Sequence, residues 1–269
     1  VGSNPTLSSK GDRMKKIVCC TLIMLGCDDK ITAQNIAENA RHTYEADMVA
    51  TYSDSVVPAA KLNETELSTR AAAVKVFTPG MGRGSGCYVN YKGTNLVITA
   101  AHVIRNSKTN WFWIVNNKQK VKAHAVYFND SEDIALLAIP DAKVAKSVPL
   151  TVQNTYPAIG EEIIYSGWPG HHSLLTIRGE VVGYQKISGG KEKLVVHTYG
   201  WPGASGSCFF NAAGEIVGVL VALPVERGYV PQLLESMMYA TPIKHLDLTR
   251  LDDQICTLPE NLRPEMCKK

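Results

Sequence analysis

The chain has 269 residues, of which 45% are hydrophobic and 20% are charged, as in an ordinary soluble globular protein. This composition excludes a collagen, a coiled coil, a disordered tail and a polytopic membrane protein. The net charge of +3 lies entirely in residues 1–26, which hold four basic side chains and one acidic side chain. The rest of the chain is neutral, so its charge gives no reason to expect a nucleic-acid partner.

Residues 14–26 have the pattern of a secretory signal peptide. Met14 and two lysines form a basic start, and an apolar run of nine residues follows from Ile17 to Leu25. This length suits a signal peptide, because a membrane-spanning helix needs about 20 residues. Residues 1–13 are a polar leader that no signal peptide requires, so we expect them to be a mis-called segment upstream of a true start at Met14.

The end of this segment, Met24-Leu25-Gly26-Cys27, resembles the lipobox of bacterial lipoproteins. The resemblance implies that the Cys27 thiol carries a lipid and anchors the exported protein at the periplasmic face of the cell envelope. Asp28 resembles an inner-membrane retention signal of enterobacterial lipoproteins. Met24 departs from the usual leucine, and a plain cleaved signal peptide with an incidental cysteine is the alternative.

Residues 27–70 are predicted to be a tether. The segment is polar and rich in Ala and Thr, and its apolar residues recur every four positions between Ala33 and Met48. That spacing predicts one short helix with a thin apolar stripe.

From residue 71 the sequence changes to short β-rich runs separated by turn residues. Eleven such runs at nearly regular spacing predict an all-β protein built of antiparallel barrels or sandwiches. The segment 148–160, rich in Pro, Thr and Gly, divides the runs into halves at about 71–150 and 155–250, and 251–269 remains as a C-terminal tail. Helical patterns are expected in the body only after His102 and near 243–251.

Three separated peptides carry residues suited to nucleophilic catalysis. His102 follows an apolar strand, Asp133 directly precedes another, and Ser205 lies in the sequence Gly203-Ala204-Ser205-Gly206-Ser207. A serine hydroxyl needs an adjacent base, and a histidine base needs a carboxylate that holds its ring and stabilises the imidazolium. Glycines beside the serine let two backbone amides point at a developing oxyanion. In the order His, Asp, Ser, the three peptides indicate acyl-transfer chemistry.

The same peptides resemble those of the chymotrypsin-like (trypsin-fold) serine proteases, most closely the HtrA/Deg type. TAAHV at 99–103, DIALL at 133–137 and GASGS at 203–207 match the family's histidine, aspartate and nucleophile motifs. The resemblance implies two antiparallel β-barrels over 71–250, with the active site in the cleft between them. It assigns His102 as the base, Asp133 as its partner and Ser205 as the nucleophile. The amides of Gly203 and Ser205 would form the oxyanion hole.

The sequence departs from this family at several points. Ala204 stands where the pancreatic enzymes carry an aspartate that receives a freed N-terminal amine, so this route of activation is not expected. Ser207 replaces the usual second glycine after the nucleophile. No PDZ-like segment follows before Lys269, so the trimer formation and PDZ control of typical HtrA proteins are not expected to transfer.

The resemblance also predicts the pocket for the residue before the cleaved bond. Its walls would be the segment before the nucleophile, which contains Tyr199, and the strand Val221-Ala222-Leu223. Tyr199 aligns with the aspartate of trypsin-like enzymes, and Leu223 stands where a glycine would admit a large aromatic ring. We therefore expect a shallow apolar pocket and cleavage after Val, Ala or Ile.

The remaining patterns favour no cofactor. The glycine-rich run 80–86 lacks dinucleotide spacing and leads into a strand, and no Cys/His cluster has zinc spacing. Four cysteines in the body allow three pairings, of which Cys256–Cys267 is favoured. His197 is interpreted as strand packing, with a place at the substrate cleft as the alternative.

The leading prediction is an envelope-facing, lipid-anchored serine endopeptidase that acts on proteins or peptides and needs no metal. The alternative is a catalytically silent binding or scaffold protein of the same fold.

Overall fold

The computed structural model describes residues 61–79, 82–116, 119–140, 146–170, 172–187, 191–226, 232–263 and 267. The predicted signal peptide, Cys27, Asp28 and the helix at 33–48 lie outside these residues. Within the described part of the chain, no helix is both long enough and apolar enough to cross a bilayer.

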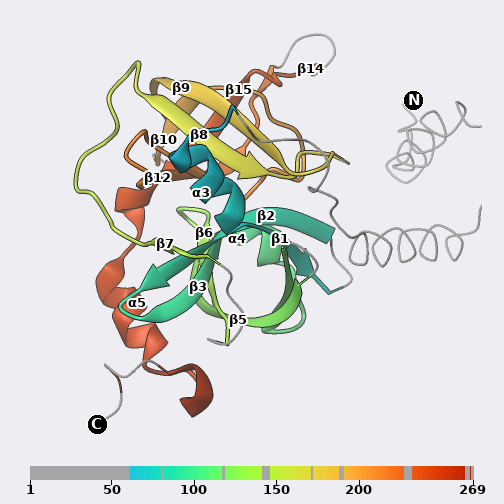
Figure 1. The fold of residues 1–269 in the computed structure, drawn as a ribbon, viewed down its shortest axis with the longest axis vertical. Helices are drawn as coiled ribbons and strands as arrows, with labels where there is room; N and C mark the ends of the chain where they lie inside the picture. Colours follow the sequence, from blue (N-terminus) through green and yellow to red (C-terminus); the bar gives the residue numbers. More distant parts are fainter. Residues whose placement is uncertain are drawn as a thin grey trace, which may run out of the picture. The chain divides into compact units, whose positions relative to one another are not determined.

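The first half of the described chain forms a closed six-stranded antiparallel barrel, which we call barrel one (Figure 1, green). Its strands follow the order β1-β4-β5-β6-β3-β2, and pairing of β2 with β1 closes the ring. Residues Val148–Pro149 (β7) add a short parallel pairing to β2. The bounds are β1 Ala73–Thr78, β2 Gly82–Tyr91, β3 Thr94–Thr99, β4 Trp111–Asn116, β5 Gln119–Asn129 and β6 Ile134–Ala138.

The second half forms another closed antiparallel barrel, barrel two, with the order β10-β15-β12-β11-β8-β9. A small hairpin of β13 (Val225–Glu226) and β14 (Gln232–Leu233) projects between β12 and β15. The bounds are β8 Glu162–Gly167, β9 Leu175–Lys186, β10 Glu192–His197, β11 Cys208–Phe210, β12 Ile216–Ala222 and β15 Met237–Pro242. The predicted fold class, two antiparallel β-barrels, is confirmed.

A shared core joins the barrels and is wider than the predicted domain of 71–250. It combines outer faces of barrel one with β11 and β12 of barrel two and with the helix α5 (Leu248–Ile255). Leu251 and Ile255 are fully buried, and Leu258 is 5% exposed. The segment expected to be a C-terminal tail therefore closes one side of the core, because its helix presents an apolar stripe to it. The expected helix near 243–251 is the 3-10 turn η2 (Ile243–His245) followed by α5.

Helix α3 (Glu64–Ala72) lies across both barrels at the end of the predicted tether (Figure 1, blue). Asn63 and Glu66 form a reciprocal capping box at its start, which satisfies backbone amides that a helix N-terminus leaves open. Ala72 is buried in the shared core, and the Glu66 carboxylate forms two hydrogen bonds to Arg178 of β9, at 2.6 and 2.9 Å. Residues 63–70 are thus packed against the barrels rather than extended as a linker.

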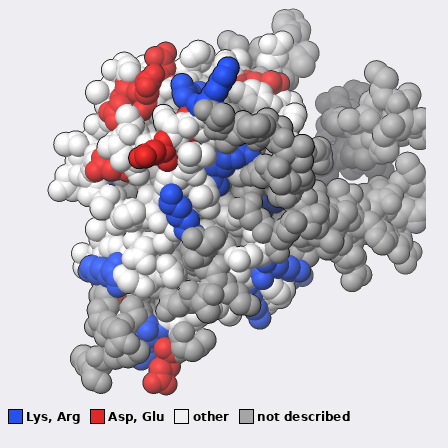
Figure 2. Space-filling view, viewed as in Figure 1, with Lys and Arg blue, Asp and Glu red and all other residues white. Residues whose placement is uncertain are grey.

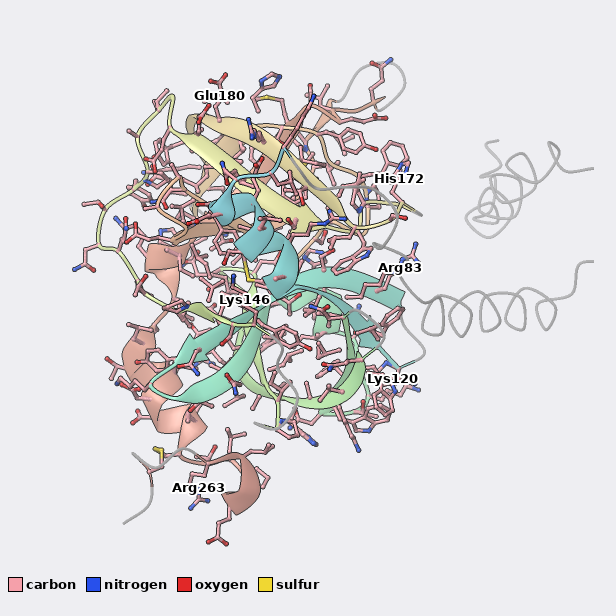
Figure 3. All side chains as sticks on the ribbon, viewed as in Figure 1. Arg83, Lys120, Lys146, His172, Glu180 and Arg263 are labelled. Atoms are coloured by element: carbon pink, nitrogen blue, oxygen red, sulfur yellow. A yellow bond between two sulfur atoms is a disulfide. The ribbon has the colours of Figure 1, made fainter. Side chains whose placement is uncertain are left out.

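Two disulfides cross-link the described part of the chain (Figure 3, yellow). Cys256–Cys267 closes a short loop in the C-terminal segment, which confirms that pairing. Cys87 of β2 is joined to Cys208 of β11, and both residues are at most 2% exposed. This second bond links the two barrels directly, three residues after Ser205.

Candidate active site

His102 stands in α4 (Ala101–Ile104), a single helical turn that follows β3. Both its ring and its backbone contact the same carboxylate: Nδ1 lies 2.8 Å from Asp133 Oδ2, and its amide donates to Oδ1 at 2.7 Å. Two contacts from one residue fix the orientation of the ring relative to the carboxylate. When Nδ1 carries the proton toward Asp133, Nε2 is left with a free lone pair.

Asp133 occupies the turn just before β6, with a left-handed backbone (φ 59°). Its carbonyl accepts from the Ala101 amide at 3.2 Å, which ties this turn to the start of α4. Burial raises the pKa of the Asp133 carboxyl. The hydrogen bonds and charge of His102, together with the Arg105 guanidinium, lower it by more, so the pKa lies below its usual value. Asp133 is therefore ionised at neutral pH. Asp130, three residues before Asp133, instead contacts Arg105 at the surface.

Ser205 lies in the loop between β10 and β11 and is packed against barrel one. Its carbonyl accepts from the Ser85 amide at 2.8 Å. A Cβ on Gly84 would lie only 2.9 Å from the Ser205 carbonyl oxygen and 2.6 Å from Val103. A Cβ on Gly206 (φ 91°) would overlap Ser85 and Thr99. These glycines let the loop approach Val103, the residue after His102, so the structure places Ser205 beside the segment that carries His102.

The amides of Gly203 and Ser205 are aimed by the carbonyls that precede them. The Pro202 carbonyl accepts from the Gly170 amide at 2.7 Å, and the Ala204 carbonyl accepts from the Ser207 amide at 3.0 Å. Because a trans peptide is planar, the N–H of the next residue points the opposite way. In the described part of the chain, neither the Gly203 nor the Ser205 amide donates to a protein acceptor. Both are therefore available to a ligand oxygen.

Barrel one holds this loop through Ser85 and the neighbouring segment between β8 and β9 through Arg83. Sequence reasoning did not single out either residue as a site residue. The Ser85 hydroxyl donates to the Gly203 carbonyl at 2.8 Å and accepts from the Trp168 amide at 3.1 Å. Arg83 donates to the Gly170 carbonyl at 2.7 Å, and Figure 3 places Arg83 on the same side as His172, just after Gly170. The run Gly84-Ser85-Gly86 is the sequence signal that could have indicated these contacts, because its small residues permit the close approach of β2 to the Ser205 loop.

Of the predicted specificity residues, Tyr199 lines the two recesses described below, whereas Val221, Ala222 and Leu223 line neither of them. Tyr199 borders a recess of about 440 Å³ with Gly170, His172, Trp201 and Glu235. Val221 is 7% exposed, and Leu223 packs partly against the core of barrel two, with Ala222 half-buried between them. The recess is thus lined by an acid and aromatic rings as well as by apolar surface.

A larger recess of about 650 Å³ lies on barrel two and also includes Tyr199. Its lining contains Glu162, Glu180 and Glu235, together with His197, whose side chain is exposed. Figure 2 shows acidic side chains gathered over barrel two, the half of the view in which Figure 3 labels Glu180. His197 therefore lines a recess rather than packing inside its strand. Among the described residues, no group of His, Cys, Asp and Glu is arranged to hold a metal ion.

Comparisons with known proteins support a trypsin-like peptidase fold. The model of the trypsin-like peptidase domain matches residues 84–219, a span that contains His102, Asp133 and Ser205. A search of curated proteins returned no significant match. The active form of the Rv3671c protease from M. tuberculosis is similar in structure, with a TM-score of 0.57, 18% identity, and coverage of 77% of this chain and 87% of that chain.

Two further structures are similar at the level of the fold. An inactive form of the Rv3671c protease gives a TM-score of 0.54 at 18% identity and covers 77% of this chain and 96% of that chain. The serine endoprotease from Yersinia pestis gives 0.52 at 20% identity, with coverage of 74% and 65%. The matched domain spans half of the sequence and contains all three predicted residues. The chain therefore belongs to the trypsin-like peptidase family.

Proposed function

We propose that the chain is a serine endopeptidase that hydrolyses peptide bonds through an acyl-enzyme on Ser205. The observation that carries the proposal is the two-point contact of His102 with Asp133, at 2.7 and 2.8 Å, beside the packed Ser205 loop. The two aimed amides of this loop strengthen the proposal, because catalysis needs charge stabilisation as well as a base.

In the proposed reaction each group has one task. The Ser205 hydroxyl attacks the substrate carbonyl carbon while His102 Nε2 takes its proton, and the Gly203 and Ser205 amides donate to the oxyanion that forms. Asp133 stabilises the imidazolium. Collapse of the intermediate breaks the C–N bond, and His102 gives its proton to the leaving amine. Water then attacks the Ser205 ester by the same route in reverse, which restores the free enzyme.

The proposed substrates are proteins or peptides of the cell envelope, cleaved after small aliphatic residues. This preference rests on the alignment of Tyr199 and Leu223 with pocket walls. One methylene in such a pocket changes the barrier by only about 1–3 kcal/mol, so discrimination among Val, Ala and Ile is expected to be modest. A peptide library cut mainly after Arg, Lys or Glu would contradict it.

Labelling with a fluorophosphonate tests the reaction class directly. The full chain is expected to incorporate one equivalent of probe on Ser205, and Ser205→Ala to incorporate none while unfolding at the same denaturant concentration. Labelling of Ser205→Ala would place the nucleophile elsewhere. A folded wild-type protein that never labels would instead favour a silent scaffold protein.

Anchoring at Cys27, with the protein facing the periplasm, is part of the proposal and is tested separately. Cys27→Ser is expected to block lipid attachment and release or stall the precursor, without changing fluorophosphonate labelling. If this variant still partitions into membranes and is processed at the same bond, a plain signal peptide replaces the lipoprotein assignment.

A further inference from the structure

A buried charged cluster is centred on Glu132, the residue directly before Asp133. Lys193 of β10 is only 1% exposed, although burial of an ammonium group is costly unless partners surround it. Its Nζ donates to the Glu132 carbonyl at 2.8 Å and to the Thr241 hydroxyl at 2.6 Å. The Thr241 hydroxyl in turn donates to the same Glu132 carbonyl. Two groups of barrel two therefore hold one carbonyl of barrel one.

The Glu132 carboxylate supplies the negative charge that this cluster needs. It contacts Lys191 at 2.8 Å, His245 Nδ1 at 2.9 Å and Lys193 at 3.6 Å. Burial raises the pKa of Glu132. The hydrogen bonds from Lys191 and His245 lower it by more, so the pKa lies below its usual value. Burial lowers the pKa of Lys193. The Glu132 carboxylate is therefore ionised at neutral pH. His245 Nε2 also lies within hydrogen-bond distance of the Tyr156 hydroxyl, at 3.2 Å.

The held carbonyl belongs to the peptide that leads into Asp133. Asp133 is one of two non-glycine residues with a left-handed φ in the described chain, a conformation that persists only when the surroundings enforce it. Among the described residues, its carboxylate accepts hydrogen bonds only from His102, and the nearest other charge is Arg105 at 3.9 Å. The direction of the carboxylate therefore depends on how its backbone is held.

We propose that Lys193 and Thr241 are positioning residues that hold the Glu132–Asp133 peptide from barrel two and so keep the Asp133 carboxylate directed at His102. This inference rests on the proposed function, because it assigns Asp133 a catalytic task. It makes the acid of barrel one dependent on docking of barrel two. Glu132 acts indirectly, since its charge makes the burial of Lys193 tolerable.

Thr241→Val is the sharpest test, because valine keeps the shape of threonine and removes the hydroxyl. Compared with the wild type, we expect kcat to fall about 10-fold, equivalent to about 1.4 kcal/mol, with KM within about twofold. The fall of kcat/KM in acid, which we call the acid limb, occurs when His102 becomes protonated and cannot accept the Ser205 proton. This acid limb should move to lower pH, because a displaced carboxylate stabilises the His102 imidazolium less. Thr241→Ser retains the hydroxyl and should restore both parameters.

Two further variants make the result specific. Thr94→Val removes a buried barrel-one hydroxyl that has no hydrogen-bond partner, so it should leave kcat and the pH profile unchanged. Lys193→Met should lower kcat more than Thr241→Val, but its buried site makes misfolding a risk, and Thr241→Val therefore decides the matter.

The inference is overturned if folded Thr241→Val keeps the wild-type kcat and acid limb, or if Thr241→Ser is as impaired as Thr241→Val. A loss of kcat that merely follows the folded fraction, with an unchanged acid limb, also overturns it, because a purely structural role predicts that result. A wild-type protein that does not label with fluorophosphonate overturns the proposed function as well, which separates the two failures.

Discussion

Individual strands of the two barrels are buried to different degrees. β1 and β6 of barrel one are buried along their whole length, whereas β9 of barrel two is buried only at Val181. Each barrel also has the opposite kind of strand, since β5 of barrel one is partly exposed and β12 of barrel two is almost wholly buried. Asp133 directly precedes a fully buried strand of barrel one, whereas Ser205 lies in a loop of barrel two. Ser85 and Arg83 of barrel one hold segments beside Ser205, so this loop is held by groups of both barrels.

The largest expected effect comes from removing the three predicted catalytic residues. Ser205→Ala, His102→Ala and Asp133→Asn should each lower kcat by on the order of 10⁴-fold or more, measured as peptide hydrolysis. The double variant Ser205→Ala/His102→Ala should be no worse than either single variant, because the residues act as a unit. An Asp133→Asn enzyme with nearly normal turnover would contradict the assignment and turn attention to Asp130.

The next largest effect is the loss of stability when a disulfide is removed, and it should be larger for the disulfide between the barrels than for the one at the C-terminal end. Their cysteines are 121 and 11 residues apart, and loop-closure entropy predicts losses of roughly 5 and roughly 3 kcal/mol in unfolding free energy. Cys87→Ala/Cys208→Ala should therefore lower the urea midpoint more than Cys256→Ala/Cys267→Ala. Equal midpoints for the two variants would mean that the unfolded chain already keeps the barrels together.

A smaller effect is expected when the Ser85 hydroxyl, which contacts the loop that carries Gly203 and Ser205, is removed. Ser85→Ala leaves the Trp168 amide without its acceptor and the Gly203 carbonyl without its donor, which costs about 1–3 kcal/mol of stability. Turnover should fall about 10-fold, because the Gly203 amide is then less well aimed. Ser207→Ala is the matched control, since the Ser207 hydroxyl is buried without a hydrogen-bond partner. If both variants behave alike, Ser85 has no special role.

The smallest effect concerns the ion pair that docks α3 on barrel two. Hydrogen bonds from Arg178 hold the pKa of Glu66 below its usual value, although burial raises it. The unfolded state therefore binds more protons as the pH falls, and the contribution of the pair is present at neutral pH and lost in acid. Glu66→Gln keeps a capping oxygen and should lower stability at pH 7 only slightly, since Arg178 is exposed and solvent screens the pair. The difference from the wild type should shrink below about pH 4; a constant difference would exclude the charge as its source.

Much of the fold was predictable because its signals are local. Apolar runs bounded by turns mark the strands, and each motif around His102, Asp133 and Ser205 lies within a few residues of sequence. The pairing of Cys256 with Cys267 is of the same kind, since only a short loop separates the two thiols.

The remaining features depend on partners far away in the sequence. From the sequence alone, Lys193 is expected to be a solvent-exposed residue of a strand. Its burial is explained by its contact with Glu132, 61 residues earlier. Helix α3 has a polar sequence, and its packing depends on Arg178, 112 residues from Glu66. The Cys87–Cys208 bond likewise joins strands of different barrels. No periodicity reports such contacts, because each partner looks ordinary in its own segment.

The bond between Cys87 and Cys208 also determines what a cut in the backbone can do. The connection between the barrels runs from β7 to β8 and exposes two thirds of Ile159, so it is the kind of segment at which a peptidase could nick another copy of itself. Any single cut between residues 87 and 208 leaves the two fragments covalently joined, and the halves that carry His102 and Ser205 cannot drift apart. A nicked molecule would run as one species without reductant and as two with it, while its active-site groups stay together.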